Sequence, residues 1–165
     1  MTRSGRRREL QGRALVAGEA AGPALVLEAP LSLWGGMDPD TGRLSDHHHP
    51  QVGTTLTGQI LVMPSGRGSS SSSSVLAESI RLGTAPLAIL LSAPDDILVL
   101  GALVAQYLYA RTCPIVVLPD GAAGAIATGD HVEVAGDRIA LLRPRDRSGQ
   151  ARGLPGDRGW PPDEA

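Results

Sequence analysis

The chain has 165 residues, which fits one domain, and its formal net charge of −2 gives no general attraction to nucleic acid. All 15 basic side chains are arginines because lysine is absent, so Schiff-base catalysis and a P-loop lysine are excluded. The one cysteine, Cys113, can form no internal disulfide and cannot hold an iron–sulfur cluster unaided.

The two ends of the sequence differ from its middle. Residues 1–9 carry four arginines and predict a flexible basic arm, without the interleaved aromatic side chains that favour base stacking. No secretory signal follows this start, and no apolar run approaches the roughly 20 residues that span a bilayer, so we expect a cytoplasmic protein with no membrane partner. Residues 144–165 have almost no aliphatic side chains and predict a disordered tail, in which Trp160 could dock.

Between the ends, short strands come first. Residues 13–20 and 23–29 are separated by Ala-Gly, a pattern that predicts a β-hairpin. Residues 30–53 are rich in Gly, Pro and Asp, and the apolar side chains Leu33 and Trp34 among them favour a long but ordered loop.

The middle of the chain predicts alternating strands and helices. Continuous apolar runs predict three buried strands, at 57–64, 86–92 and 112–119. Helical spacing predicts helices at 72–82 and 95–110, and residues 129–143 read as a closing hairpin. We therefore expect an α/β fold over residues 10–143: a compact β/β/α domain with a short parallel strand–helix–strand core flanked by antiparallel strands.

The segment GRGSSSSSS, residues 66–74, lies between a predicted buried strand and a predicted helix, not between two domains. Serine is a good N-cap, so the run could serve only to start the helix. Alternatively, Gly66 and Gly68 allow backbone angles closed to other residues, and consecutive amides then form an anion site beside the helix N-terminus. Arg67 could add a bidentate grip on a carboxylate or phosphate.

Together the strings PLSLWGGMDPDTGRLSDHHHP, GQILVMPSGRGSSSSSSVLAE and GTAPLAILL resemble the small-subunit, or swivel-domain, side of aconitase X, from about Gly12 to Arg143. That family includes the archaeal phosphomevalonate dehydratase small subunit and bacterial hydroxyproline dehydratases. The pairing of PLS-x-WGG-x-DP-x-TG with GRGSSS is specific, whereas either motif alone is weaker. Both termini lie outside the resemblance.

The resemblance implies a two-part hydro-lyase. A larger partner would hold an iron–sulfur cluster or iron, and this chain would bind no cofactor alone. The serine after the G-[RK]-G pattern, here Ser69, would be the base that removes a proton from a carboxylate-bearing substrate. From the residues themselves we expect Gly66, Arg67, Gly68 and Ser70 to bind the anion. A GC-rich bacterial composition favours cis-3-hydroxy-L-proline as the substrate, with (R)-5-phosphomevalonate as the alternative.

Other readings stay open from the sequence. A non-catalytic interaction module and a stand-alone hydrolase are alternative functions, although no Ser-His-Asp spacing supports the second. Trp34 could be a core residue or an exposed anchor for the large partner. Adjacent side chains point in different directions, so His47–His49 favour packing or an interface contact over a metal site. Residues 38–42 favour a structural turn, and Cys113 a buried small hydrophobe.

Overall fold

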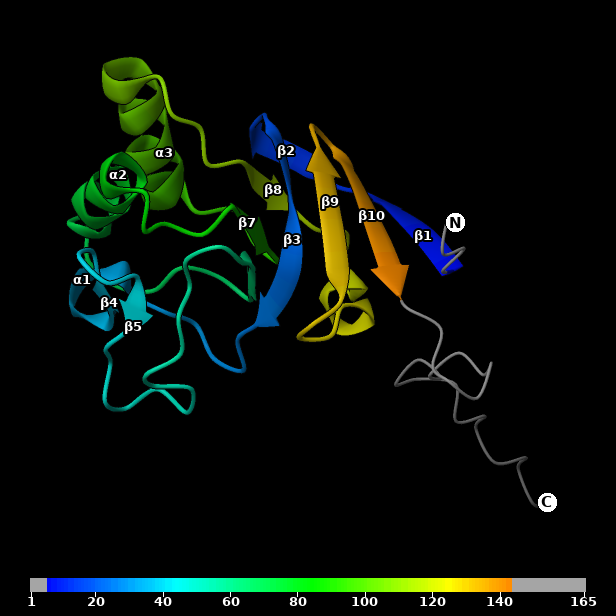
Figure 1. Ribbon diagram of the computed structural model, residues 1–165, viewed down its shortest axis with the longest axis horizontal. Coiled ribbons are helices and arrows are strands. Elements are labelled where there is room, and N and C mark those ends of the chain that lie inside the picture. Colours follow the sequence, from blue (N-terminus) through cyan, green and yellow to red (C-terminus); the bar gives the residue numbers. More distant parts are fainter. Residues whose placement is uncertain (1–5, 144–165) are drawn as a thin grey trace.

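The computed structural model describes residues 6–143 (Figure 1). The helices are α1 (Leu33–Gly36), α2 (Ser72–Leu82), α3 (Asp96–Tyr109) and the 3-10 turn η1 (Ala122–Ala125). The strands are β1 (Arg6–Gln11), β2 (Arg13–Val16), β3 (Glu19–Val26), β4 (Met37–Asp38), β5 (Arg43–Leu44), β6 (Ile60–Met63), β7 (Ala88–Leu91), β8 (Ile115–Val117), β9 (His131–Ala135) and β10 (Arg138–Arg143).

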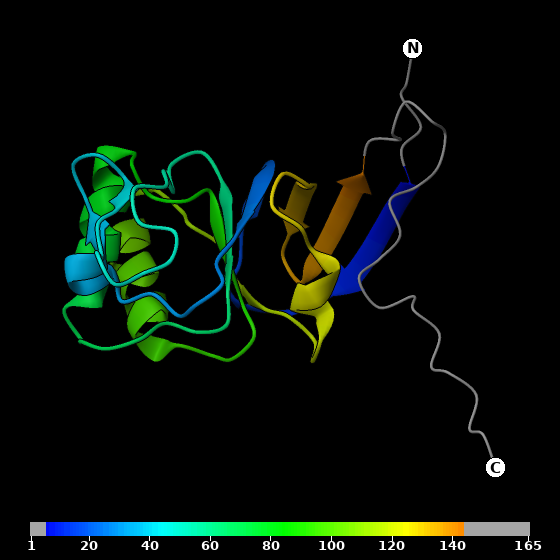
Figure 2. The same ribbon diagram turned by 90° about the horizontal axis from the view of Figure 1, so that it is seen from below.

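Eight strands follow the order β1-β10-β9-β3-β6-β7-β8-β2, in which the pairs β3–β6, β6–β7 and β7–β8 are parallel and the others are antiparallel. Figure 2 shows three layers, with α2 and α3 on one side of the parallel strands and the β9, β10 and β1 ribbon on the other. The predicted α/β fold with a β/β/α arrangement is therefore confirmed, including its parallel core and flanking antiparallel strands.

The two sides of the parallel strands carry separate hydrophobic clusters. In β6, Leu61 and Met63 pack in the cluster on the helix side, whereas Ile60 and Val62 pack in the cluster against β9 and β10. Because successive side chains of a strand point to opposite faces, a strand buried on both faces reads as a continuous apolar run. That is why the three runs in the sequence were recognisable as buried strands.

The predicted hairpin over 13–20 and 23–29 is wrong. β2 pairs with β8, and the second segment is part of the long strand β3, which pairs with β9 through residues 19–23 and with β6 through residues 24–26. Gly22 is not a turn residue: a Cβ there would collide with the side chain of Leu87, at 2.7 Å. The glycine allows a close approach as β3 crosses from one β layer to the other.

The predicted basic arm over 1–9 is also wrong for Arg6–Glu9, which lie in β1 and pair antiparallel with β10. Charged side chains are common on edge strands, where they discourage pairing with other chains, so the arginines did not reveal this strand. Arg7 forms exposed ion pairs with Glu9 and Glu133. Leu10 packs against the hydrophobic cluster between the parallel strands and β9 and β10. Residues 1–5, and the tail predicted over 144–165 with Trp160, lie outside the described residues.

The parallel strands place two helix N-termini at one edge of the sheet. α2 follows the carboxyl end of β6, and α3 follows the carboxyl end of β7. In open α/β sheets this edge is where ligands usually bind. Within residues 6–143, no helix is long and apolar enough to cross a bilayer.

Candidate active site

The segment that joins β6 to α2 contains Gly66, Arg67, Gly68 and Ser69. Gly68 has φ +94°, a left-handed conformation that favours glycine, and a Cβ there would lie 3.0 Å from Ser32 Oγ. Gly66 is needed for a different reason, because a Cβ there would collide with the carboxylate of Asp95. Both glycines of the GRG pattern therefore serve close approaches to neighbouring segments.

Backbone amides before α2 remain available for a ligand. The N–H groups of Ser72, Ser73 and Ser74 donate to carbonyls three residues earlier, at 3.0–3.2 Å. In the described part of the chain, no hydrogen bond satisfies the N–H groups of Gly68, Ser69 or Ser70. Three consecutive unsatisfied donors beside a helix N-terminus favour an anion.

Ser69 is half-buried, and its Oγ accepts a hydrogen bond of 3.1 Å from the amide N–H of Ser71. This bond places positive potential next to the hydroxyl oxygen, which favours its deprotonated form. The residue in the N-cap position of α2 is Ser71, and its side chain makes no capping hydrogen bond. The serine run is therefore not a simple side-chain cap, although the Ser69 bond also has a local structural role.

The motif at residues 31–36 packs directly on the serine segment. Leu31 and Gly66 form a parallel β-bridge, and the Arg67 N–H donates to the Leu31 carbonyl at 3.2 Å. The buried Ser72 Oγ accepts the Trp34 N–H at 3.1 Å. The two sequence motifs, more than 30 residues apart, thus form one structural unit.

Trp34 is 60% exposed, so it is not a core residue. Its backbone is held by Ser72 while the ring faces solvent next to the serine segment. The reading of Trp34 as an exposed anchor fits this geometry. Its contact with a partner stays a prediction.

The β7–α3 junction supplies a residue that the sequence did not reveal as part of the site. Asp95 is the N-cap of α3, and its Oδ1 accepts the N–H groups of Ile97 and Leu98, both at 3.0 Å. A pocket of about 20 Å³ lies between this junction and the serine segment. It is lined by Leu31, Gly66, Arg67, Gly68, Ser69, Ser72, Asp95, Ile97 and Leu98.

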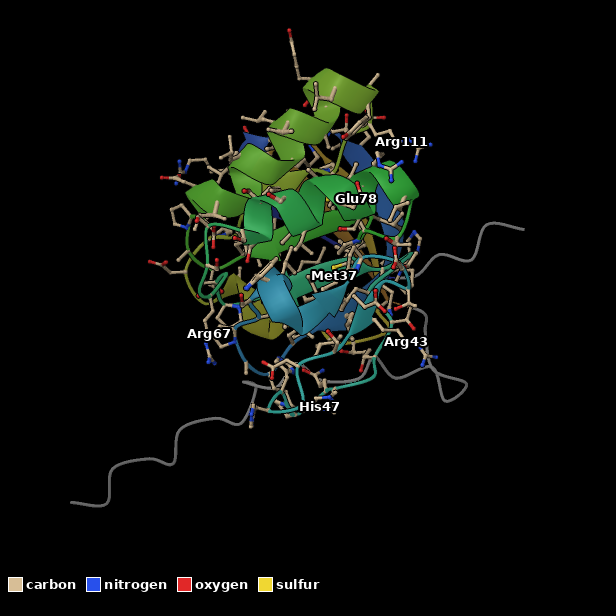
Figure 3. All side chains as sticks on the ribbon, turned by 90° about the vertical axis from the view of Figure 1, so that its left-hand side faces the viewer. Met37, Arg43, His47, Arg67, Glu78 and Arg111 are labelled. Atoms are coloured by element: carbon tan, nitrogen blue, oxygen red, sulfur yellow. The ribbon has the colours of Figure 1, made fainter. Side chains whose placement is uncertain are left out.

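The structure brings Gly66, Arg67, Gly68 and Ser69 together around the pocket, but Ser70 is not part of its lining. The Ser70 carbonyl instead accepts the N–H and hydroxyl of Ser73. Figure 3 shows Arg67 at the edge of the face formed by α1, α2 and β5, with its side chain extending outward. Arg67 has no ion-pair partner within the described residues, so its guanidinium is free to bind an anion.

The histidine run and the turn at residues 38–42 make hydrogen bonds that hold local structure. The buried His49 ring accepts the Gln51 N–H through Nδ1 and donates from Nε2 to the Ala29 carbonyl, while His47 and His48 are exposed. At Asp38, hydrogen bonds from the Asp40 N–H and the Thr41 hydroxyl lower the pKa of the carboxyl group. Residues 38–42 therefore form the structural turn that the sequence favoured.

The residues that the structure describes do not fit an iron or cluster site. Residues 6–143 contain no group of three His, Cys, Asp or Glu side chains that could hold a metal ion. Cys113 is fully buried, and burial raises the pKa of its thiol to about 12, so at neutral pH it is not the thiolate that a metal binds. This confirms Cys113 as a buried small hydrophobe.

Comparison with known proteins identifies the family of this fold. The family profile that describes the aconitase X swivel domain matches residues 9–142. The chain belongs to this family. The crystal structure of holo-form Thermococcus kodakaraensis aconitase X has a TM-score of 0.74 and 32% identity to the swivel domain described above, covering 82% of this chain and 99% of that chain.

Curated relatives of this swivel domain include two enzymes named cis-3-hydroxy-L-proline dehydratase. The Pseudomonas aeruginosa enzyme is 52% identical over 64% of this chain, and the Hypocrea jecorina enzyme is 40% identical over 82%. The chain spans only 18% and 23% of their lengths. The phosphomevalonate dehydratase small subunit of Methanothermobacter thermautotrophicus is 39% identical over 59% of this chain and 74% of its own length.

Proposed function

We propose that this swivel domain is the small subunit of a cytoplasmic, two-subunit aconitase X-type hydro-lyase, and that it supplies Ser69 as the catalytic base. The observation that carries the proposal is the junction before α2: Ser69 lies beside three unsatisfied amides, between the 31–36 motif and the start of α3. The similarity to named dehydratases over most of the domain supports the same reaction class.

The chemistry of this chain consists of binding an anion and accepting a proton. The amides of Gly68, Ser69 and Ser70, with Arg67, would bind the substrate carboxylate and hold the adjacent carbon beside Ser69 Oγ. Ser69, as an alkoxide that has lost its own proton to solvent, would then accept the proton from that carbon as hydroxide leaves the neighbouring carbon, so that the substrate loses one water molecule overall. The Ser71 N–H and the helix N-terminus would stabilise the alkoxide form of Ser69 before it accepts the proton, because a neutral serine hydroxyl is a weak base in water.

The large partner completes the site in this proposal. An iron or iron–sulfur centre held there would act as the Lewis acid for the departing hydroxide. The described residues of this chain contain no group that could hold such a centre, so in this proposal its ligands come from the partner. The exposed Trp34 ring beside the serine segment is suited to packing against that partner.

The proposed substrate is cis-3-hydroxy-L-proline, because the two relatives with that name have identities of 52% and 40%. The alternative is (R)-5-phosphomevalonate. The phosphomevalonate dehydratase small subunit favours this alternative, because it is itself a separate small subunit and the aligned region covers 74% of its length.

The test is reconstitution with the candidate large subunit, loaded with iron, and measurement of substrate loss. We expect dehydration of cis-3-hydroxy-L-proline by the assembled enzyme and none by either chain alone. Turnover by this chain alone would contradict the two-subunit proposal. Turnover of (R)-5-phosphomevalonate instead would move the assignment to the alternative substrate.

If the assembled proteins bind each other but convert neither compound, the chain is an interaction module in place of a catalytic subunit. A Trp34→Ala variant would then weaken assembly by about tenfold or more, since exposed aromatic side chains dominate many interfaces. A matched change at an exposed apolar residue away from the site, Val52→Ala, provides the control.

A further inference from the structure

The pocket beside Ser69 is lined by one charged residue of each sign, Arg67 and Asp95. A site that bound only a carboxylate or phosphate would gain nothing from a carboxylate next to it, because like charges repel. Asp95 is nevertheless fixed there by two backbone hydrogen bonds. Its place suggests a role in addition to capping α3.

The two oxygens of the Asp95 carboxylate have different surroundings. Oδ1 is occupied by the N–H groups of Ile97 and Leu98, which fix the plane of the carboxylate. Oδ2 lies against Gly66, in the space that a side chain at that position would fill, and Asp95 lines the pocket. Across residues 6–143, Oδ2 has neither a hydrogen-bond donor nor an ion-pair partner.

The free oxygen and the size of the pocket fit a small cationic group. The volume of about 20 Å³ has room for roughly one water-sized group, so the N–H donors of a ring ammonium would reach the pocket while the ring stays outside it. Leu31, Ile97 and Leu98 contribute apolar walls, and an ion pair beside apolar walls is stronger than one in water. A substrate could thus place its ammonium against Asp95 while its carboxylate reaches the amides before α2.

We propose that Asp95 binds the ammonium of a zwitterionic cyclic amino acid and so determines the class of substrate. The proposal rests on the function proposed above and adds to it a residue from a second strand–helix junction. Such a substrate meets an anion site and a cation site on either side of Ser69. A phosphorylated hydroxy acid has no ammonium and would bring a second negative charge to Asp95.

The test compares two ligands that differ in one ring atom. L-Proline carries a ring ammonium, and (S)-tetrahydrofuran-2-carboxylate has the same ring and carboxylate with a neutral oxygen in its place. Dissociation constants for both are measured by isothermal titration calorimetry on the assembled enzyme. We expect the wild type to bind L-proline about 10- to 100-fold more tightly, the usual range for a hydrogen bond to a charged group.

Asp95→Asn is the informative variant, because asparagine caps helices as well as aspartate and retains an oxygen for the Ile97 and Leu98 amides. It should abolish the preference for L-proline with little change in melting temperature. Asp96→Asn is the matched control: it removes the same charge from the next residue, which is exposed and does not line the pocket. That variant should retain the wild-type preference.

Equal binding of the two ligands by the wild type, no binding of either, or a preference that survives Asp95→Asn would overturn the assignment of Asp95. Turnover of cis-3-hydroxy-L-proline tests the proposed function separately. If the enzyme converts this compound but its ligand preference is the same after Asp95→Asn, only the role of Asp95 is contradicted. If the enzyme prefers L-proline through Asp95 but does not convert cis-3-hydroxy-L-proline, only the proposed reaction is contradicted.

Discussion

Both long helices begin where a parallel strand ends, but their first turns are completed in different ways. At α3, the Asp95 side chain accepts the N–H groups of Ile97 and Leu98. At α2, six serines surround the start, yet the N-cap residue Ser71 makes no side-chain capping bond. The amides of Gly68, Ser69 and Ser70 have no acceptor in the described part of the chain.

This difference separates a helix start built for stability from one built for a ligand. The donors at the start of α3 are bound by the Asp95 side chain, whereas the loop before α2 keeps the amides of Gly68, Ser69 and Ser70 available for an anion. The two starts also touch, because Gly66 before α2 packs on the Asp95 carboxylate before α3. The β7–α3 junction therefore supports the segment between β6 and α2, and substitutions in the two segments test this contact.

The largest effect is expected from Ser69→Ala in the assembled enzyme. Loss of a general base should lower kcat by roughly 10²–10⁴. Stability should fall by only about 1 kcal/mol, because one hydrogen bond from the Ser71 amide is lost. Steady-state kinetics and thermal denaturation measure the two effects separately.

Ser74→Ala is the control, since Ser74 is exposed within the same run and does not line the pocket. It should leave both kcat and stability nearly unchanged. If Ser69→Ala and Ser74→Ala kept the same kcat, the serine segment would be structural and the two helix starts would differ only in their caps.

The next largest effect is expected from Gly66→Ala, which pushes the two junctions apart. The new Cβ collides with Asp95, so we expect a loss of about 1–3 kcal/mol of stability and roughly a hundredfold lower kcat from misplacement of Ser69. Gly124→Ala is a matched control, because a Cβ there meets no atom within 4 Å.

A double variant shows whether the collision is the cause. Adding Asp95→Ala to Gly66→Ala removes the colliding carboxylate, so the combined loss of stability should be smaller than the sum of the two single losses. Strict additivity, measured by thermal or urea denaturation, would argue against contact between the two junctions.

A smaller effect, on stability, is expected from Ser72→Ala. This change leaves the Trp34 amide without its acceptor and should cost about 1–3 kcal/mol. Ser72 is buried, so it is unsuitable as a neutral control for Ser69 despite belonging to the same run. Urea denaturation of Ser72→Ala beside Ser74→Ala should separate the buried serine from the exposed one, and equal midpoints would contradict the role of Ser72.

The smallest effect compares the two N-cap positions directly. Asp95→Ala removes a side-chain cap and should destabilise the domain by about 1 kcal/mol. Ser71 is at the equivalent position in α2, but Ser71→Ala removes no capping bond, so the free energy of unfolding should change by less than about 0.5 kcal/mol. A loss at Ser71 as large as that at Asp95 would mean that α2 is capped after all.

Several elements could be predicted because their signals are local. The apolar runs in β6, β7 and β8 are buried on both faces, and α2 and α3 follow helical spacing. β1 and the true course of β3 were missed. The arginines of an edge strand resemble a free arm, and Gly22 resembles a turn although it lies within a strand.

The sequence by itself determined the β/β/α order, the GRG segment before a helix and the resemblance to the aconitase X swivel domain, because each depends on neighbouring residues. Only the tertiary structure decided that residues 31–36 pack on that segment through Ser72, and that Asp95 of the next junction lies against Gly66. These contacts join residues about 30 to 40 positions apart in the sequence. Parallel strands bring their carboxyl ends to one edge, but side-chain packing alone selects which residues meet there.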